Sequence, residues 1–287
     1  MDAPHPTRPT QHVVPATVPV ALEAPPQMRA AVAEVLAGEY EAGFFGEALT
    51  VLDIGANVGS FALWASLRWP RSTVHAFEPH PGTFAMLERN VAAWPDVRAR
   101  HAAVYPTAED HVEFFGRYAG DGEAGVADCM ARTFREIAPE RTMRVPALHP
   151  RALPTADVVK LDVEGAEADI LRHMDLTAVQ LVVLEFQDDA NRRAIRELLA
   201  ARFELVYEDA FAWDDLLRDS GYQPALAGDS WGRMFFAARQ PNGRLRRLAP
   251  PRANAAPVDA APVPPGRTGR RHVVASVLER AARRLRR

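Results

Sequence analysis

The first segment whose residue types point to chemistry reads Val51-Leu52-Asp53-Ile54-Gly55-Ala56-Asn57-Val58-Gly59-Ser60-Phe61. It is an apolar run that leads into a glycine-containing turn and then into residues with helical character. Gly55 and Gly59 allow the backbone to approach a ligand closely, and Asp53 places a carboxylate near the carboxyl end of the run. Because the start of the following helix also offers unpaired N–H groups, the segment suits a nucleoside that carries an ammonium group.

The spacing of these glycines separates two classes of cofactor. A dinucleotide fingerprint aligned at Gly55 requires glycine at positions 57 and 60, where this chain has Asn57 and Ser60. Nicotinamide cofactors therefore rank below S-adenosylmethionine, whose amino group Asp53 can contact. A nicotinamide-dependent oxidoreductase remains the weaker alternative, and for Asp53 alone the structural alternative is an N-cap or a turn former.

A second carboxylate stands 25 residues after Asp53, in Ala76-Phe77-Glu78-Pro79 at the end of the next predicted strand. In open α/β sheets an acidic residue at this point accepts hydrogen bonds from both ribose hydroxyls of a bound nucleoside. Together with the first motif, this spacing predicts that Glu78 binds the ribose. The structural alternative is a solvated carboxylate at a strand end.

A third group of charges lies in Val158-Val159-Lys160-Leu161-Asp162-Val163-Glu164-Gly165-Ala166-Glu167. Lys160 is the one lysine among 34 Lys and Arg residues, which suggests a position that needs a compact ammonium group. In an extended segment Lys160, Asp162 and Glu164 share one face, and such a charged face indicates that the strand end opens into a cleft. Glu185 ends another apolar run and should reach the same region. A salt-bridged strand end is the structural alternative.

Apolar runs alternate with helical segments along residues 28–240. Continuously apolar strands separated by helices of about ten residues predict a doubly wound α/β domain with a mostly parallel sheet. In such a sheet the carboxyl ends of the strands meet at one edge, which brings the three charged motifs together. The predicted strands are residues 49–54, 73–77, 97–104, 112–115, 158–163, 181–186, 203–207 and 233–238. The predicted helices are residues 27–37, 60–69, 83–94, 131–137, 166–174 and 190–201.

The segments that flank this domain differ from it in composition. Residues 1–27 are rich in proline and small residues and are predicted to be disordered. Residues 241–271 are predicted to be a Pro-, Ala- and Arg-rich linker, and residues 272–287 a short basic amphipathic helix. That helix could lie on an anionic membrane, dock on a partner protein or remain a solvated tail.

The charge distribution excludes some classes of partner. Residues 241–287 hold 12 Arg against Asp259 and Glu279, so the net charge of −3 conceals an acidic domain and a basic tail. An acidic domain argues against nucleic-acid binding. Cys129 is the only cysteine, which rules out an internal disulfide. The sequence contains no apolar run long enough for a signal peptide or a membrane span. We therefore expect a cytoplasmic protein, which would be peripheral at the inner face of the membrane if the tail binds lipid.

These three motifs make the sequence resemble the FkbM family of S-adenosylmethionine-dependent methyltransferases over residues 48–238. The resemblance implies a Rossmann-like class I methyltransferase fold, with a seven-stranded sheet whose last strand is antiparallel. It also implies methyl transfer to a hydroxyl of a sugar, glycolipid or secondary-metabolite intermediate. The family commonly has Leu-Asp where this chain has Leu148-His149, and a serine within the segment that here reads Asp128-Cys129-Met130. These departures concern the acceptor more than the reaction. The cofactor-binding residues that the resemblance supports are Asp53, Gly55, Asn57, Gly59 and Glu78.

Methyl transfer from a sulfonium to an alcohol needs an aligned acceptor oxygen and a group that removes its proton. We expect Asp162 or Glu164 to act as the base. Lys160 would orient the base or lower the pKa of the hydroxyl, and Glu185 would hold a small-molecule or glycan acceptor. The segments predicted to build the acceptor pocket are residues 105–150 and 209–232, which include Trp213, Tyr222 and Trp231.

Three alternatives to this chemistry remain open. Asp162 and Glu185 could hold Mg²⁺ and polarise a diol, although two carboxylates are few for a dedicated metal site and no such site is predicted. A histidine could supply the base instead, but an isolated histidine is more often structural. A catalytically silent nucleoside-binding module would keep the cofactor site without an acceptor site. The candidate histidines are His80, His149 and His173.

Overall fold

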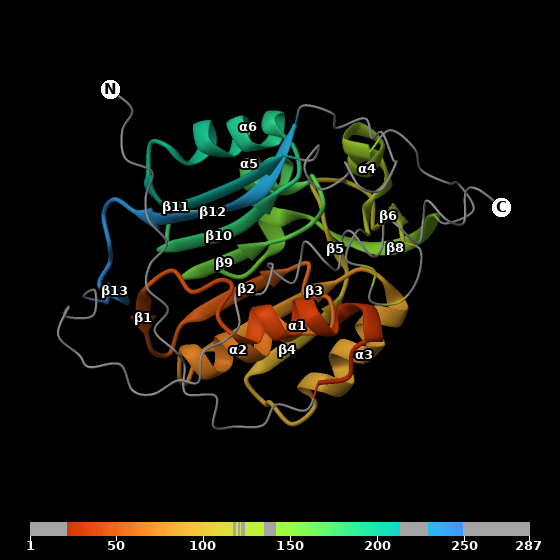
Figure 1. Ribbon diagram of the computed structural model, residues 1–287, viewed down its shortest axis with the longest axis horizontal. Helices are drawn as coiled ribbons and strands as arrows, with labels where there is room; N and C mark the ends of the chain where they lie inside the picture. Colours follow the sequence, from red (N-terminus) through yellow and green to blue (C-terminus); the bar gives the residue numbers. More distant parts are fainter. Residues whose placement is uncertain are drawn as a thin grey trace.

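The computed structural model describes residues 22–116, 119, 121, 124–134, 142–212 and 229–248, and its centre is a seven-stranded sheet (Figure 1). The strands of this sheet are β2 (Thr50–Ile54), β3 (Thr73–Glu78), β4 (Val97–His101), β9 (Val158–Leu161), β10 (Leu181–Phe186), β11 (Phe203–Ala212) and β12 (Ser230–Ala238). They lie in the order β11-β12-β10-β9-β2-β3-β4. Pairing is parallel from β10 to β4, whereas β12 is antiparallel to both of its neighbours. The predicted doubly wound α/β fold with an antiparallel last strand is thus confirmed.

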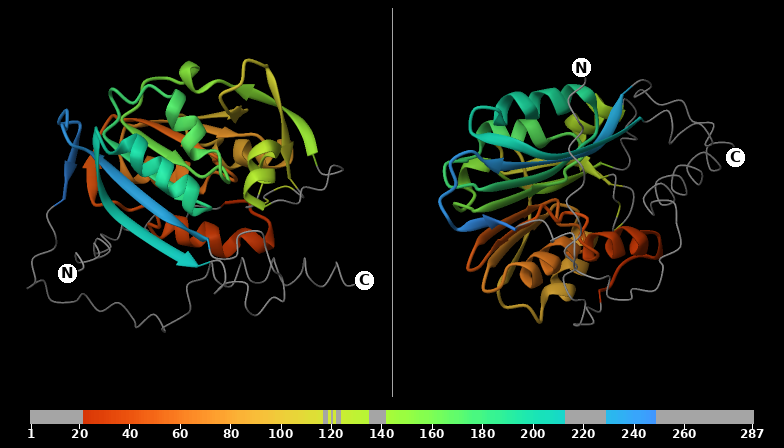
Figure 2. Two further views of the ribbon diagram at one scale, coloured as in Figure 1. Left: turned by 90° about the horizontal axis from the view of Figure 1, so that it is seen from above. Right: turned by 60° about the vertical axis from the view of Figure 1, so that its left-hand side comes forward.

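Helices cover both faces of the sheet (Figures 1 and 2). One face packs against α1 (Arg29–Leu36), α2 (Ser60–Arg68) and α3 (Pro81–Val91), and the other against α5 (Glu167–His173) and α6 (Asp189–Leu199). Successive strand residues alternate between the two faces, so that Val51 packs with the first set of helices and Leu52 with the second. A further helix, α4 (Ala127–Phe134), and two 3₁₀ turns, Pro26–Met28 and Pro150–Ala152, complete the described helical segments.

Two smaller sheets flank the large one. β5 (Ala103–Val104), β8 (Thr142–Leu148), β6 (His111–Phe115) and β7 (Gly125–Val126) form a four-stranded sheet in that order. β1 (Phe44–Gly46) pairs antiparallel with β13 (Leu245–Arg247). β13 falls inside residues 241–271, where the sequence predicts a linker, so a strand that belongs to the fold lies beyond residue 240.

The main predicted elements are present, with differences at their ends. The strand predicted at residues 158–163 stops at Leu161, and the helix predicted at residues 131–137 is instead α4, which begins at Ala127. The short strands β1, β7, β8 and β13 were not predicted, because two to seven residues without a regular apolar pattern carry little signal. Residues 22–27, part of the segment 1–27 that is predicted to be disordered, are described and include the start of the 3₁₀ turn. Residues 1–21 and 249–287 lie outside the described residues, so disorder in the rest of that segment and the basic tail helix stay predictions. In the part of the chain that is described, no helix is long and apolar enough to cross a bilayer.

Candidate functional site

A cleft opens beside the point where the strand order reverses, between β2 and β9. Open α/β sheets bind their ligands at this reversal, beyond the carboxyl ends of the strands. The space between the walls of the cleft, including its open mouth, is about 970 Å³. Asp53, Gly59 and Glu185 do not line it. The predicted site residues that do line it are Gly55, Asn57, Glu78, Lys160, Asp162 and Glu164.

The cleft is also lined by a segment that the motifs do not include. α1 follows the 3₁₀ turn at Pro26–Met28 and presents Ala31, Val32 and Val35 to the cleft, and Tyr40 follows a few residues later. Apolar walls of this kind, with a few polar groups among them, are typical of small-molecule sites.

Part of the predicted acceptor region reaches the cleft. Phe114, Asp121 and Val126 are lining residues that lie within residues 105–150. Trp213 and Tyr222 lie outside the described residues. Trp231 packs on Phe211, with ring centroids 5.3 Å apart, and does not line the cleft.

Charged side chains gather on the face of the sheet that α1 and α2 cover. In each strand the charged residue stands two positions from an apolar residue of that face, as in Val51 and Asp53 or Val158 and Lys160. The strand register then places Asp53 beside Lys160. It also places Glu185 of β10 beside Arg233 of β12. Alternation and register together therefore concentrate these charges at one edge of the sheet.

The ammonium of Lys160 lies at the centre of this group. Nζ donates a hydrogen bond of 2.6 Å to the carbonyl of Gly55 and lies 3.4 Å from Asp53 Oδ1 and 3.8 Å from Asp162 Oδ2. Burial alone would lower the pKa of Lys160, but the negative charges around it, chiefly Asp53 and Asp162, outweigh burial and raise the pKa. Lys160 therefore stays charged and ties the turn after β2 to the end of β9.

Asp53 is fully enclosed, with 0% of its surface exposed. Neither carboxylate oxygen has a hydrogen bond of normal geometry, so its charge is balanced by the ion pair with Lys160. The sequence predicts that Asp53 contacts the amino group of a bound ligand. In the structure the ammonium group beside Asp53 is that of Lys160.

Glu78 lines the cleft and is held by the backbone. Its Oε2 accepts a hydrogen bond of 3.0 Å from the amide of Asn57, and its Oε1 one of 2.8 Å from the amide of His80. Burial raises the pKa of Glu78 to about 7, against the lowering effect of these two amides. Each oxygen keeps a second lone pair that can accept a hydrogen bond from a ligand.

The side chain of Asn57 indicates whether a polar ligand fits the cleft. Its Oδ1 is buried without a hydrogen-bond partner, and the residue holds a left-handed backbone conformation with φ of 49°. Buried polar atoms in native proteins are nearly always paired, so this oxygen marks a place for a donor from a ligand or a water molecule. With Glu78 and the apolar walls beside it, the cleft fits a nucleoside such as the adenosyl group of S-adenosylmethionine.

The two glycines of the first motif face protein atoms. A Cβ on Gly55 would lie 1.9 Å from the carbonyl oxygen of Asp162, and a Cβ on Gly59 would lie 2.7 Å from Leu87 Cδ1. Gly55 is thus required by the close approach of the loop after β9, and Gly59 by packing against α3. Both have positive φ, 79° and 92°, which a residue with a side chain adopts only with strain.

The loop after β9 is held by a buried carboxylate that the sequence reading did not assign. Glu167 accepts hydrogen bonds from the amides of Val163 (3.0 Å) and Gly165 (3.1 Å). Burial raises its pKa to about 7. Glu164, between these two amides, has φ of 55°, so its position in the cleft is set by this loop and not by strand alternation.

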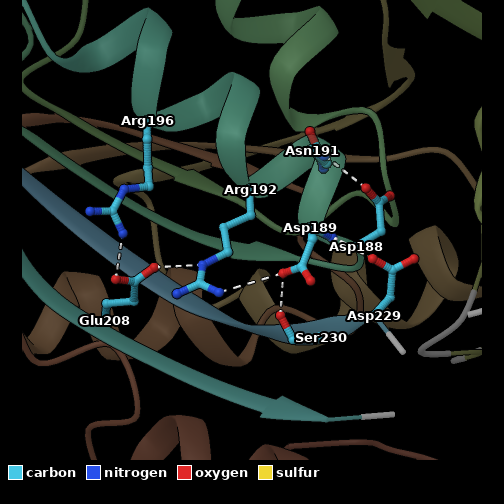
Figure 3. Close-up of polar contacts among 8 residues, drawn as sticks. All are labelled: Asp188, Asp189, Asn191, Arg192, Arg196, Glu208, Asp229 and Ser230. Atoms are coloured by element: carbon cyan, nitrogen blue, oxygen red, sulfur yellow. Dashed lines mark hydrogen bonds and ion pairs between the residues drawn. The ribbon is translucent and has the colours of Figure 1, made fainter. Parts of the chain in front are cut away.

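The N-terminal end of α6 supports the same loop, because Asn191 Nδ2 donates to Glu167 Oε2 at 2.5 Å. The helix is in turn fixed to the start of β12, because Ser230 Oγ donates to Asp189 (2.5 Å) and the amide of Asp189 donates to Asp229 (3.2 Å) (Figure 3).

Tyr40, which lies outside the three motifs, contacts two of the predicted catalytic residues. Its hydroxyl donates to Glu185 Oε1 at 3.0 Å and lies 3.4 Å from Asp162 Oδ2. Glu185 is 3% exposed, and Arg233 beside it binds Glu39 (3.0 Å). No signal in the sequence connects Tyr40 to Glu185, because 145 residues separate them.

The candidate histidines have structural partners. His80 Nδ1 accepts from the amide of Thr83 and caps α3, and His149 Nδ1 accepts from the amide of Arg151. His173 Nδ1 contacts the carbonyl oxygen of Asp169 at 2.9 Å. None of the three histidines lines the cleft. Within the described residues, no cluster of three or more His, Cys, Asp or Glu side chains is arranged to hold a metal ion.

The known proteins similar in sequence to this chain are mostly methyltransferases. Residues 53–224 match the sequence profile described as "Methyltransferase FkbM domain". AmbE of Pseudomonas aeruginosa, an AMB antimetabolite synthetase, is 29% identical over 63% of this chain and 10% of its own length. Methyltransferase 1 of Beauveria bassiana is 27% identical over 47% of this chain and 62% of its own length. The chain therefore spans less than two thirds of both relatives.

Two further relatives carry names that specify an acceptor. "Hexuronic acid methyltransferase AglP" of Haloferax volcanii is 27% identical over 52% of this chain and 60% of its own length. "31-O-demethyl-FK506 methyltransferase FkbM" of Streptomyces tacrolimicus is 58% identical over 40 residues, 14% of this chain and 15% of its own length. Among solved structures, precorrin-6y C5,15-methyltransferase of Geobacter metallireducens is 15% identical, with a TM-score of 0.37 over 71% of this chain and 86% of its own.

Proposed function

This chain belongs to the FkbM methyltransferase family, and we propose that this S-adenosylmethionine-dependent enzyme methylates a hydroxyl of a sugar, glycolipid or secondary-metabolite intermediate. The observation that carries the proposal is the position of Asp162. Its carboxylate lines the cleft, and its side chain is 20% exposed at the end of β9, next to the Lys160 ammonium. The names of AglP and FkbM, which refer to a hexuronic acid and to a 31-O-demethyl compound, support an oxygen acceptor.

The cofactor would be held by residues of the first two motifs. Glu78 would accept hydrogen bonds from the ribose hydroxyls, and Asn57 Oδ1 would accept one from the nucleoside. Asp53 would act through Lys160 rather than by direct contact, because its carboxylate does not line the cleft.

When bound, the cofactor supplies a methyl group on a sulfonium, so the carbon–sulfur bond breaks toward sulfur as the acceptor oxygen bonds to carbon. Asp162 would take the hydroxyl proton, and its ion pair with Lys160 would hold its side chain in place. Glu164, the second carboxylate in the cleft, is the alternative base.

A magnesium-assisted reaction finds less support in the geometry. Asp162 and Glu185, the two carboxylates it would use, both face the hydroxyl of Tyr40, and the Lys160 ammonium lies 3.8 Å from Asp162. A cation already occupies the neighbourhood that Mg²⁺ would need. We expect methyl transfer to persist in EDTA.

The first experiment is calorimetric titration of the purified protein with S-adenosylmethionine and S-adenosylhomocysteine, with NAD and NADP as controls. We expect micromolar binding of the first pair, weakened in Glu78→Ala. Binding of NAD or NADP instead would overturn the cofactor assignment.

The acceptor is then sought with methyl-labelled S-adenosylmethionine and a panel of neutral glycosides, hexuronates and amines. Label on a hydroxyl is expected, and label transferred only to amines would overturn O-methylation. Asp162→Asn should lower turnover by about 10²–10⁴-fold, the usual contribution of a general base, with cofactor binding retained. Glu164→Gln is the matched control, and a larger loss in that variant would move the base to Glu164.

A further inference from the structure

Tyr40 lies upstream of residues 53–224, so the family match does not account for its place in the cleft. The residue is 2% exposed, and its ring is packed edge to face on Phe61 at 5.3 Å and tilted against Phe235 at 6.4 Å. The ring therefore fixes the position of the hydroxyl, which ends beside Glu185 and Asp162.

The backbone around Tyr40 is fixed as well. Glu39 binds Arg233 of β12 at 3.0 Å, and Glu41 binds Arg68 of α2 at 2.5 Å. Both carboxylates are buried, with 8% and 7% of the residue exposed. These two buried ion pairs hold the backbone on either side of Tyr40, in addition to the packing of its ring.

The hydroxyl of Tyr40 has a single hydrogen to donate. At 3.0 Å from Glu185 and 3.4 Å from Asp162, the first carboxylate is the better acceptor. The charged groups that face Glu185 from the neighbouring strands are Lys160 on β9 and Arg233 on β12, with Asp162 beyond the end of β9. Glu185 is thus surrounded by donors and cations, whereas Asp162 opens to the cleft.

We infer that Tyr40 is a positioning residue of the methyl-transfer site, which fixes Glu185 as a permanent hydrogen-bond acceptor and leaves Asp162 as the carboxylate that takes the proton of the acceptor hydroxyl. The inference rests on the proposed function and adds a residue from the segment before the family domain. It also changes the role expected for Glu185, from holding the acceptor to holding Tyr40.

The test is Tyr40→Phe, which removes the hydroxyl and keeps the ring. The side-chain carboxyl carbons of Asp and Glu are labelled with ¹³C and titrated by NMR in the full-length protein, with Glu185→Gln and Asp162→Asn to assign the two resonances. A hydrogen bond to a charged group is worth about 1.5–3 kcal/mol, so its loss should move the titration of Glu185 upward by about one to two pH units. This measurement needs no acceptor and no cofactor.

Tyr207→Phe is the matched control, because Tyr207 is also buried, packs on Phe235 at 4.8 Å and donates to a carboxylate, Asp209, at 2.7 Å outside the cleft. It should move the Glu185 resonance much less than Tyr40→Phe does, because Tyr207 reaches Glu185 only through Asp209 and Arg233. A response of Asp162 in place of Glu185, or of neither, in Tyr40→Phe would overturn the inference. With an acceptor in hand, Tyr40→Phe should lower kcat by about tenfold or more at unchanged KM for S-adenosylmethionine. Failure of the wild-type protein to bind S-adenosylmethionine would refute the proposed function separately, since the NMR titration does not depend on it.

Discussion

Glu78 combines a ligand-facing position with a pKa close to neutrality. Burial raises the pKa of its carboxyl to about 7, and only the ionised form offers both oxygens as acceptors to ribose hydroxyls. A ligand that prefers the ionised form binds more weakly as the pH falls below that pKa. The affinity for the cofactor should therefore depend on pH through the ionisation of Glu78 alone.

We predict that the Kd for S-adenosylmethionine rises as the pH falls from 8 to 6, by up to about tenfold per pH unit below 7. Glu78→Gln should bind more weakly and lose most of this slope, as measured by calorimetry at each pH. Glu167→Gln is the control and should keep this slope. Burial raises the pKa of Glu167 to about 7 as well, but Glu167 does not line the cleft. A flat profile in the wild-type protein would contradict the role of Glu78.

Lys160 and Asp53 form a buried pair in which each residue needs the other. Their side chains are 4% and 0% exposed, and their charged atoms are 3.4 Å apart. Breaking a buried ion pair by removing one partner typically costs about 3–5 kcal/mol, whereas replacing both partners costs far less. Lys160→Met should therefore lower the free energy of unfolding by about this amount.

The double variant Lys160→Met with Asp53→Asn should recover most of the loss, because Asp53, the fully buried partner, then carries no charge that needs compensation. Urea denaturation of the wild-type, single and double variants measures this difference. If the double variant is no more stable than Lys160→Met, the stabilising role of Lys160 lies in its hydrogen bond to Gly55 or in its pairing with Asp162.

At the scale of elements, the turn after β2 and the loop after β9 are built against each other. The carbonyl of Asp162 occupies the space that a side chain on Gly55 would need, whereas Gly59 faces the flexible end of Leu87. Backbone cannot move aside as a side-chain terminus can, so the two glycines should tolerate substitution differently.

Gly59→Ala should cost about 1–3 kcal/mol, the usual penalty for a strained backbone conformation. Gly55→Ala should cost more, because the loop after β9 must also shift and carry Asp162 with it. Thermal denaturation ranks the two variants, and S-adenosylmethionine binding reports on the cleft. Equal stability losses would show that the loop after β9 is free to move.

The elements themselves were the most predictable part of the molecule. β9 and β10 are continuous runs of buried residues, and β2 and β3 are mostly buried. The alternation of such strands with helices was sufficient to predict a doubly wound sheet. The carboxylates at strand ends could be predicted to converge for the same reason. The position of Glu164 could not be predicted in this way. Glu164 itself has a left-handed backbone conformation, which interrupts the strand alternation on which the prediction depended.

At the scale of the whole molecule, the contacts that no sequence pattern revealed are those between distant segments. Tyr40 reaches Glu185 across 145 residues, and Arg233 reaches Glu39 across 194. Hydrophobic periodicity reports only on a residue's own element, so such partners become visible only when the sheet is assembled. The same limitation concealed the pairing of β1 with β13.

This pairing should stabilise the domain. Leu245 of β13 is 6% exposed and packs in the core cluster on the α1–α2 face, and the preceding Arg244 lies 3.3 Å from the buried Asp157. A chain that ends at residue 240 should be less stable than one that ends at residue 248 by about 2–5 kcal/mol, the usual cost of removing a buried leucine side chain. Urea denaturation of the two truncated chains compares them directly. Equal stabilities would show that β13 is not part of the cooperative unit.

The β1–β13 pair also joins the last described strand to the segment that carries Tyr40. Phe44 and Arg247 are register partners, and Phe44 follows Tyr40 by only a few residues. β13 does not line the cleft, but through β1 it helps to hold the segment from which Tyr40 reaches the cleft. A part of the chain that lies beyond the family domain thereby supports the geometry of the site inside it.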